Sequence, residues 1–186
     1  MNDTTVSSEI AGPYAKALMS VAVDNNAADQ VGVEAADLLE VLASSEELRG
    51  FLVSPLMSPD AKKGVLRQIA EGKVSDFLLS FLLLLVDRGR VAFLQPILQQ
   101  YQSLLRDRNN TVLADVVSAV ELSDDQQNAI RDRVKTMTEA NNVELSVQID
   151  PALIGGLVIK VGSQVIDASL RGQLRRIGMQ LATTAQ

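Results

Sequence analysis

The sequence predicts a mainly α protein: an N-terminal six-helix bundle followed by a smaller α/β domain with a short sheet and two helices. Through the first 108 residues, apolar side chains recur at helical spacing. From Thr111 onward the apolar runs become rich in Val and Ile and alternate with polar residues. The composition, 47% hydrophobic but only 3% aromatic, also suits packed helices. We therefore expect domains at 1–108 and 109–186, with the hinge at RDRNN, residues 106–110.

The expected bundle begins with two amphipathic helices separated by a polar break at residues 24–26. A short third helix ends before Pro55, because the residue before a proline is pushed out of the helical region. Ser58 and Pro59 fit the N-cap and first position of a fourth helix. The apolar run Phe77 to Val86 forms the fifth, and a sixth helix completes the bundle.

Three runs rich in Val and Ile predict the strands of the second domain, at residues 111–120, 143–149 and 157–168. Between the first two, Ser123 and Gln126 match a capping box that opens a helix. Within the third run, Gly162 to Gln164 predicts a hairpin turn. A last helix is expected to begin near Ser169 and to pack on the sheet through Leu170, Leu174, Ile177 and Leu181.

The composition argues against an enzyme. With no Cys and no His, the chain lacks thiolate nucleophiles, the usual zinc ligands and the side chain that most often acts as a general base near neutral pH. No paired carboxylates, nucleophile elbow or dinucleotide fingerprint stands out. The formal net charge of -6 argues against a nucleic-acid partner. We expect no catalytic residues, no metal and no cofactor.

The N-terminal stretch MNDTTVSSEI has neither the pattern of a secretory signal nor that of a transit peptide, so we expect a cytoplasm-like compartment. The longest apolar stretch, Phe77 to Val86, is about half the length that crosses a bilayer. A helix that is apolar nearly all round is either central in its bundle or buried partly by another chain. The residues alone leave both interpretations open.

The stretch GGLVIKVG, residues 155–162, has two interpretations. A phosphate-binding loop needs the spacing G-x-x-x-x-G-K-[ST], which is absent here. In the alternative, Lys160 projects from an alternating strand, and Gly155 and Gly156 bend the chain after Pro151. The spacing favours the strand.

Arg171 is a cation in the first turn of the expected last helix, where the helix dipole disfavours positive charge. Asp167 stands just before the expected N-cap Ser169. We therefore predict an ion pair between Asp167 and Arg171 that locks the strand to the helix. The alternative is an exposed pair worth less than about 1 kcal/mol.

The run LSVQIDPALIGGLVIKVGSQVIDASLRGQL, residues 145–174, resembles the C-terminal signature of the delta subunit of bacterial and chloroplast rotary ATP synthase, a relative of the mitochondrial oligomycin sensitivity-conferring protein. GPYAKAL at Gly12 to Leu18 is similar to the family's first helix. LLLLVDRGRVAFLQPILQQYQSLL at Leu82 to Leu105 is similar to its fifth and sixth. The resemblance covers essentially the whole chain and suggests a cyanobacterial or plastid-type member.

This resemblance implies a non-catalytic subunit of the peripheral stalk, or stator, of the proton-translocating ATP synthase. Such a subunit links the catalytic head to the membrane-anchored b-type stalk, so that rotor torque drives ATP synthesis. The implied partners are the alpha and neighbouring beta subunits of the head and the b-type stalk subunits, with the membrane reached only through the complex. The implied location is the cytoplasmic or stromal face of an energy-coupling membrane, the thylakoid in a cyanobacterial or plastid member.

The resemblance also implies that an alpha-subunit helix lies in a groove between the first and fifth helices. The expected contacts are Tyr14, Ala15, Leu18, Leu82, Leu83 and Val86. For the b-type stalk helices, the expected contacts in the C-terminal domain are Leu170, Leu174, Arg175 and Ile177, with Arg171 and Arg176 also at the rim of this stripe. An alternative is that this stripe packs only on its own sheet.

The family signature is strongest at residues to which we assign a structural role: Gly155, Gly156, Lys160, Gly162, Asp167 and Arg171. A function of a different class stays open beside the stator: a non-catalytic helical-bundle adaptor that binds amphipathic helices of other partners. Co-purification with an ATPase from solubilised membranes distinguishes the two.

Overall fold

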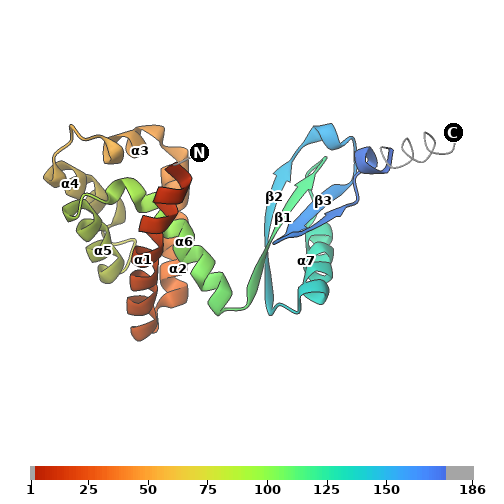
Figure 1. The fold of residues 1–186 in the computed structure, drawn as a ribbon, viewed down its shortest axis with the longest axis horizontal. Helices are drawn as coiled ribbons and strands as arrows, with labels where there is room; N and C mark the ends of the chain where they lie inside the picture. Colours follow the sequence, from red (N-terminus) through yellow and green to blue (C-terminus); the bar gives the residue numbers. More distant parts are fainter. Residues whose placement is uncertain (1–2, 175–186) are drawn as a thin grey trace. The chain divides into compact units, whose positions relative to one another are not determined.

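The computed structural model describes residues 3–174, with side chains from residue 9 onward. The chain divides into two compact units, Met1–Leu105 and Arg106–Gln186. Helices form the first unit, and a sheet with a covering helix forms the second (Figure 1). The expected fold class is confirmed.

The helices of the first unit follow one another through short connections. They are α1 (Asp3–Asp24), α2 (Ala28–Ser44), α3 (Glu46–Val53), α4 (Pro59–Ala70), α5 (Asp76–Asp87), the short 3-10 helix η1 (Val91–Phe93) and α6 (Leu94–Arg108). The last of these continues past the division between the units. Residues 106–108, which we expected in the hinge, therefore form the final turn of α6.

Side-chain caps begin two of these helices. Ser45 Oγ accepts a hydrogen bond from the Leu48 amide at 3.2 Å, and Ser58 Oγ accepts one from the Ala61 amide at 3.2 Å, with Pro59 at the first helical position as expected. At α5 the hydroxyl of Ser75 has another use. It donates to a carboxylate oxygen of Glu34 at 2.8 Å and so joins the start of α5 to the buried side of α2.

The core of the N-terminal unit is aliphatic, with one buried tyrosine. Tyr101 of α6 is fully buried, and its hydroxyl donates to the carbonyl of Ala28 at 2.9 Å, so the polar tip is satisfied at the start of α2. Each large aliphatic side chain buried here contributes about 1.5–3 kcal/mol. The fully buried ones include Leu78, Leu82, Leu85, Ile97 and Leu98.

The C-terminal unit holds a mixed four-stranded sheet in the order β2-β1-β3-β4. Its strands are β1 (Thr111–Ser118), β2 (Asn142–Ile149), β3 (Leu157–Val161) and β4 (Gln164–Asp167). The inner strand β1 pairs in parallel with β2 and antiparallel with β3. A parallel pair needs a crossover, and α7 (Asp124–Thr138) supplies it along one face of the sheet (Figure 1).

The core of this unit lies between α7 and that face. Ile130 and Val134 of α7 pack with Ala114 and Val116 of β1 and with Ile159 of β3. The predicted capping box is confirmed at the start of the helix, since the Ser123 and Gln126 side chains each accept from the other residue's backbone amide.

The hairpin predicted within the third run is confirmed, and its two strands are β3 and β4. Its turn is Gly162 and Ser163 alone, because Gln164 is already paired with Val161 as the first residue of β4. Gly162 has a φ of 56°, which glycine adopts at no steric cost.

Candidate functional site

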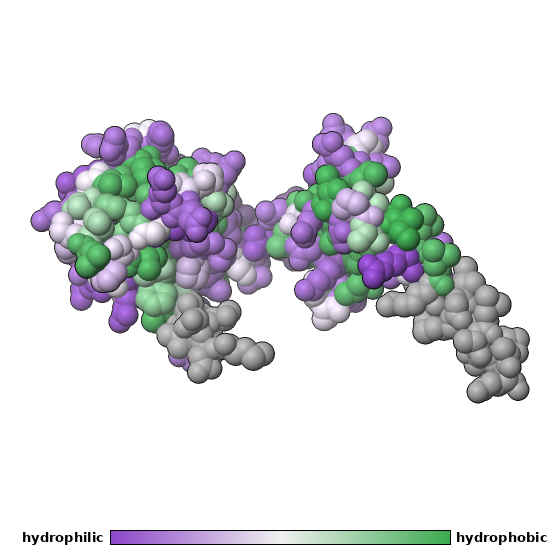
Figure 2. All heavy atoms as spheres, turned by 90° about the horizontal axis from the view of Figure 1, so that it is seen from above, coloured by the Kyte–Doolittle hydropathy of each residue, from purple (hydrophilic) through white to green (hydrophobic). Residues whose placement is uncertain are grey.

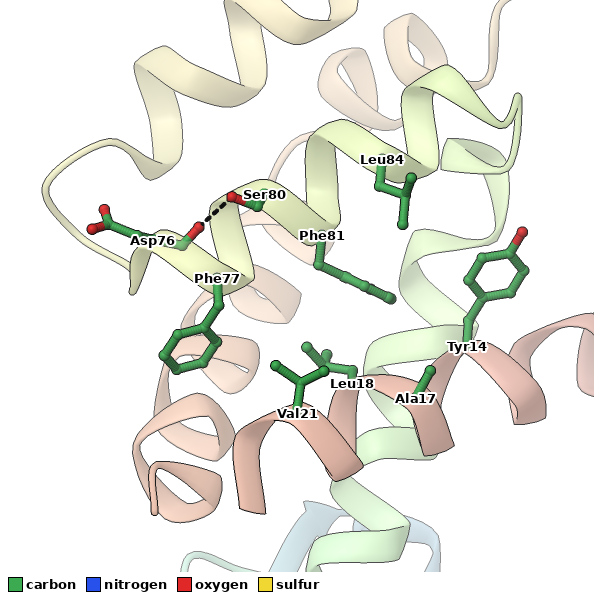
Figure 3. Close-up of a pocket in the computed structure, with 9 residues that line it drawn as sticks. All are labelled: Tyr14, Ala17, Leu18, Val21, Asp76, Phe77, Ser80, Phe81 and Leu84. Atoms are coloured by element: carbon green, nitrogen blue, oxygen red, sulfur yellow. Dashed lines mark hydrogen bonds between the residues drawn. The ribbon is translucent and has the colours of Figure 1, made fainter. Parts of the chain in front are cut away.

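The N-terminal unit has a groove between α1 and α5, with a volume of about 750 Å³. Figure 3 shows that α1 and α5 supply its two walls and that Phe77, Phe81 and Leu84 of α5 point toward α1. We call it the α1/α5 groove. Asp76 is its one charged lining residue, and the others are Tyr14, Ala17, Leu18, Val21, Phe77, Ser80, Phe81 and Leu84.

The groove exists because α5 is apolar on more than one face. One face is buried among the other helices through Leu78, Leu82 and Leu85. The other presents Phe77, Phe81 and Leu84 toward α1 (Figure 3), where Leu84 is 43% exposed. In this part of the chain, then, α5 is both central in its bundle and apolar on an accessible face.

An aromatic contact holds one end of the groove. The rings of Tyr14 and Phe81 meet edge to face, with centroids 6.5 Å apart and planes inclined at 66°. Toward the start of α5, the hydroxyl of Ser80 donates to the Asp76 carbonyl at 2.7 Å (Figure 3). The polar atoms among the lining side chains are few, so what the groove offers is chiefly apolar contact.

Of the six residues expected to contact a partner helix, two line the groove and four do not. Tyr14 and Leu18 do line the groove. Ala15 and Leu82 are fully buried in the bundle core, and Val86 is buried below a different pocket, between α3 and η1. Leu83 is half-buried and is not a lining residue. Contact with a partner helix stays a prediction for all six, and the groove favours it for Tyr14 and Leu18.

Sequence reasoning missed most of the groove wall supplied by α5. Phe77, Phe81 and Leu84 lie at spacings of four and three, which is one helical face, and Val21 faces them from α1 (Figure 3). That spacing was readable in the sequence. The spacing alone did not identify the groove face, because an equally apolar face of α5 runs through Leu78, Leu82 and Leu85.

In the C-terminal unit, the glycines of the signature shape the chain. Gly156 has a φ of 77°, and a side chain there would meet the backbone of Ala168 and Ser169. The amide of Leu170 donates a hydrogen bond to the carbonyl of Gly155 at 2.9 Å. This bond joins the bend to the start of the last described helix. Lys160 is exposed on β3, opposite Asp115 of β1.

The expected ion pair between Asp167 and Arg171 is absent from the described part of the chain, where the ion pairs are Lys63–Asp87 and Arg106–Glu144. Asp167 is used differently. Its Oδ1 accepts hydrogen bonds from the amide and hydroxyl of Ser169 at 3.0 and 2.6 Å. Ser169 in turn accepts the Gly172 amide at 3.0 Å, so it is the N-cap, as expected.

Replacing Arg171 with alanine is therefore expected to change the free energy of unfolding by no more than about 0.5 kcal/mol, because its side chain is exposed. Asp167→Ala serves as the comparison and is expected to cost about 1–2 kcal/mol, since two hydrogen bonds to Ser169 are lost. Urea denaturation of both variants checks this. A loss above 1 kcal/mol for Arg171→Ala would restore the bracing role.

The residues expected to meet the stalk are only partly described. Leu170 and Leu174 are 46% and 60% exposed, so in this chain neither is buried on the sheet as we expected. Arg175 and Ile177, like Arg176 and Leu181, lie outside the described residues. Figure 2 shows apolar surface on this unit next to the point where the described chain ends.

Among the described residues, no group of three or more acidic side chains is placed to hold a metal ion. The same residues contain no helix long and apolar enough to cross a membrane.

The chain is similar to known proteins over nearly its whole length. A model of the family "ATP synthase delta (OSCP) subunit" matches residues 10–181. The chain is similar to ATP synthase subunit delta of Acaryochloris marina, at 54% identity over 98% of this chain and 99% of that protein. It is similar to the same subunit of Synechococcus sp. (strain PCC 6716), at 55% identity over 96% and 97%.

Among solved structures, the fold is similar to that of a chain in the cryo-EM structure of the Toxoplasma gondii mitochondrial ATP synthase hexamer. The TM-score is 0.73 at 24% identity, covering 92% of this chain and 97% of that one.

Proposed function

The chain belongs to the ATP synthase delta (OSCP) subunit family, and from this premise we propose that its α1/α5 groove binds an N-terminal helix of an alpha subunit of the catalytic head. Members of this family are non-catalytic components of the peripheral stalk of F-type ATP synthase, and so is this chain. The observation that carries the proposal is the apolar groove itself.

The groove has the features of a helix-in-groove site. Such sites accept the apolar face of an amphipathic helix, with anchors at spacings of three and four. Val21 and Leu84 are 44% and 43% exposed on opposite walls, so a partner helix gains apolar burial from both. Asp76, the one charged lining residue, favours a cation on the partner at that end.

The test uses the full chain and a labelled peptide of the alpha-subunit N-terminus from the same complex, followed by fluorescence anisotropy. We expect saturable binding, weakened at least about 100-fold by Leu84→Asp and by Val21→Asp, because a carboxylate is then buried against an apolar helix. Val33→Asp is the matched control, a 64% exposed valine of α2 outside the groove.

Absence of saturable binding would overturn the proposal. So would an equal loss of affinity in Val33→Asp, since the effect would then be one of net charge and not of the groove.

We also propose that the C-terminal unit meets the b-type stalk subunits. The exposed Leu170 and Leu174 support this, because apolar side chains at helical spacing gain burial from a partner helix. In this arrangement the N-terminal unit binds the alpha and neighbouring beta subunits, and the C-terminal unit binds the stalk that reaches the membrane.

For location we propose the cytoplasmic or stromal face of an energy-coupling membrane, with the thylakoid as the membrane suggested by the cyanobacterial relatives. The chain reaches the membrane through the complex. A general adaptor for unrelated helical partners has no observation in its favour, since the family match extends over residues 10–181.

A further inference from the structure

A second apolar recess lies on a different side of the N-terminal unit, between α3, the loop from α3 to α4, and η1. It consists of two neighbouring pockets of about 260 and 60 Å³ that share Leu52, Val53, Val91 and Ala92. We call it the α3/η1 recess. It has no lining residue in common with the α1/α5 groove.

Lys62 is the feature that distinguishes this recess. It is the one charged residue lining the larger pocket, and only 9% of its surface is exposed. No hydrogen bond or ion pair to its side chain occurs within residues 9–174, whereas its neighbour Lys63 pairs with Asp87 at 2.5 Å. Because no buried side-chain nitrogen among the described residues lacks a partner, the Lys62 ammonium must reach solvent while its stem is buried. It is therefore available to pair with a carboxylate that a partner brings to the mouth of the pocket.

The smaller pocket repeats the pattern with a cation that is already used. Arg49 is its one charged lining residue, and it donates to the carbonyls of Leu42 and Ala43 at 2.7 and 3.1 Å, at the end of α2. Neither pocket has a lining carboxylate. The charged lining residues of the recess are thus both basic, although the whole chain has a net charge of -6. The recess therefore favours an acidic partner.

The rim of the recess is apolar and accessible. Met57 lines the larger pocket and is 40% exposed, in a short loop restricted by Pro55 and Pro59. Its chain neighbour Leu56 does not line the pocket but is 89% exposed. Because both prolines restrict the backbone, binding there orders little additional chain. In Figure 1 the α3 helix lies at the top of this unit, so the view from above in Figure 2 looks onto that side, where apolar and polar residues mix.

The size of the larger pocket favours a side chain over a free small molecule. At about 260 Å³ it is smaller than the roughly 300–1,000 Å³ of pockets that enclose whole ligands. We propose that the α3/η1 recess docks an acidic peptide segment of a partner subunit, which inserts an aliphatic side chain beside Leu52 and Val91 and places a neighbouring carboxylate on Lys62.

The test is a titration of the ¹⁵N-labelled full chain with the blocked octapeptide SELLEELS and with its glutamine counterpart SQLLQQLS, followed by amide chemical shifts. We expect saturable shifts at residues lining the recess with the glutamate peptide, and about tenfold weaker binding with the glutamine peptide, because the charge-assisted contact with Lys62 is lost. Lys62→Met keeps the apolar stem and is expected to remove that tenfold difference. Lys63→Met is the matched control and is expected to preserve it.

Three results would overturn the proposal: no shifts at the recess, shifts confined to the α1/α5 groove, or a preference for glutamate that survives in Lys62→Met. A dimer of the chain that forms through the recess and excludes the peptide would overturn it as well. Since the α1/α5 groove shares none of these residues, failure here leaves the alpha-subunit proposal standing.

Discussion

Gly156→Ala is expected to destabilise the C-terminal unit by about 3 kcal/mol or more, from two separate causes. Gly156 has a φ of 77°, a conformation that costs a side-chain-bearing residue about 1–2 kcal/mol. A Cβ there would also overlap the carbonyl oxygen of Ala168 and come within 3.0 Å of the Cα of Ser169. Both are backbone atoms, so relief requires movement of the connection that follows β4.

Gly162→Ala separates the two causes. Gly162 also has a positive φ, 56°, but nothing lies within 4 Å of the position of its Cβ. Its substitution is expected to cost only about 1 kcal/mol. Urea denaturation followed through the amide signals of β1 and β3 reports on this unit alone. Equal losses in the two variants would show that the close approach to Ala168 carries no cost.

The second large effect is expected from Leu82→Ala, which should lower the stability of the N-terminal unit by about 3 kcal/mol. Leu82 is fully buried, so truncation leaves a cavity in the core. Leu84 stands two residues farther along α5, about 200° around the helix, on the groove face. Leu84→Ala removes the same atoms at a 43% exposed position and is expected to cost less than about 1 kcal/mol.

The two variants should show the opposite order in binding. Leu84→Ala is expected to weaken binding of the alpha-subunit peptide by about tenfold, because part of its apolar contact is lost. Leu82→Ala, studied at a temperature where it stays folded, should bind nearly as the parent chain does. Comparable stability losses in both variants would contradict the assignment of the two faces of α5.

Features that depend on local chemistry could be predicted from the sequence. Ser58 with Pro59 marked the start of α4, the Ser123 and Gln126 box marked α7, and the change to alternating Val and Ile marked the sheet. Each rests on neighbours within a few residues, where capping and periodicity act.

The facing of α5 could not be predicted in the same way. Periodicity identifies a buried face only where polar residues define the opposite one, and from Phe77 to Val86 only Ser80 is polar. The choice between Leu82 and Leu84 as a groove residue was fixed by tertiary packing. The partner of Asp167 was equally hard to predict. Both Arg171 and Ser169 could bind its carboxylate, and in the structure Asp167 accepts hydrogen bonds from the amide and hydroxyl of Ser169.

The place where the two units join has a mechanical consequence. The chain passes from α6 into β1, an inner strand that pairs with β2 on one side and with β3 on the other. Since β4 runs parallel to β1, the chain leaves the sheet at the end opposite to where it enters. Tension between α6 and residues 170–174 therefore shears the backbone ladders along their length, so many hydrogen bonds must yield together and none can be unzipped singly.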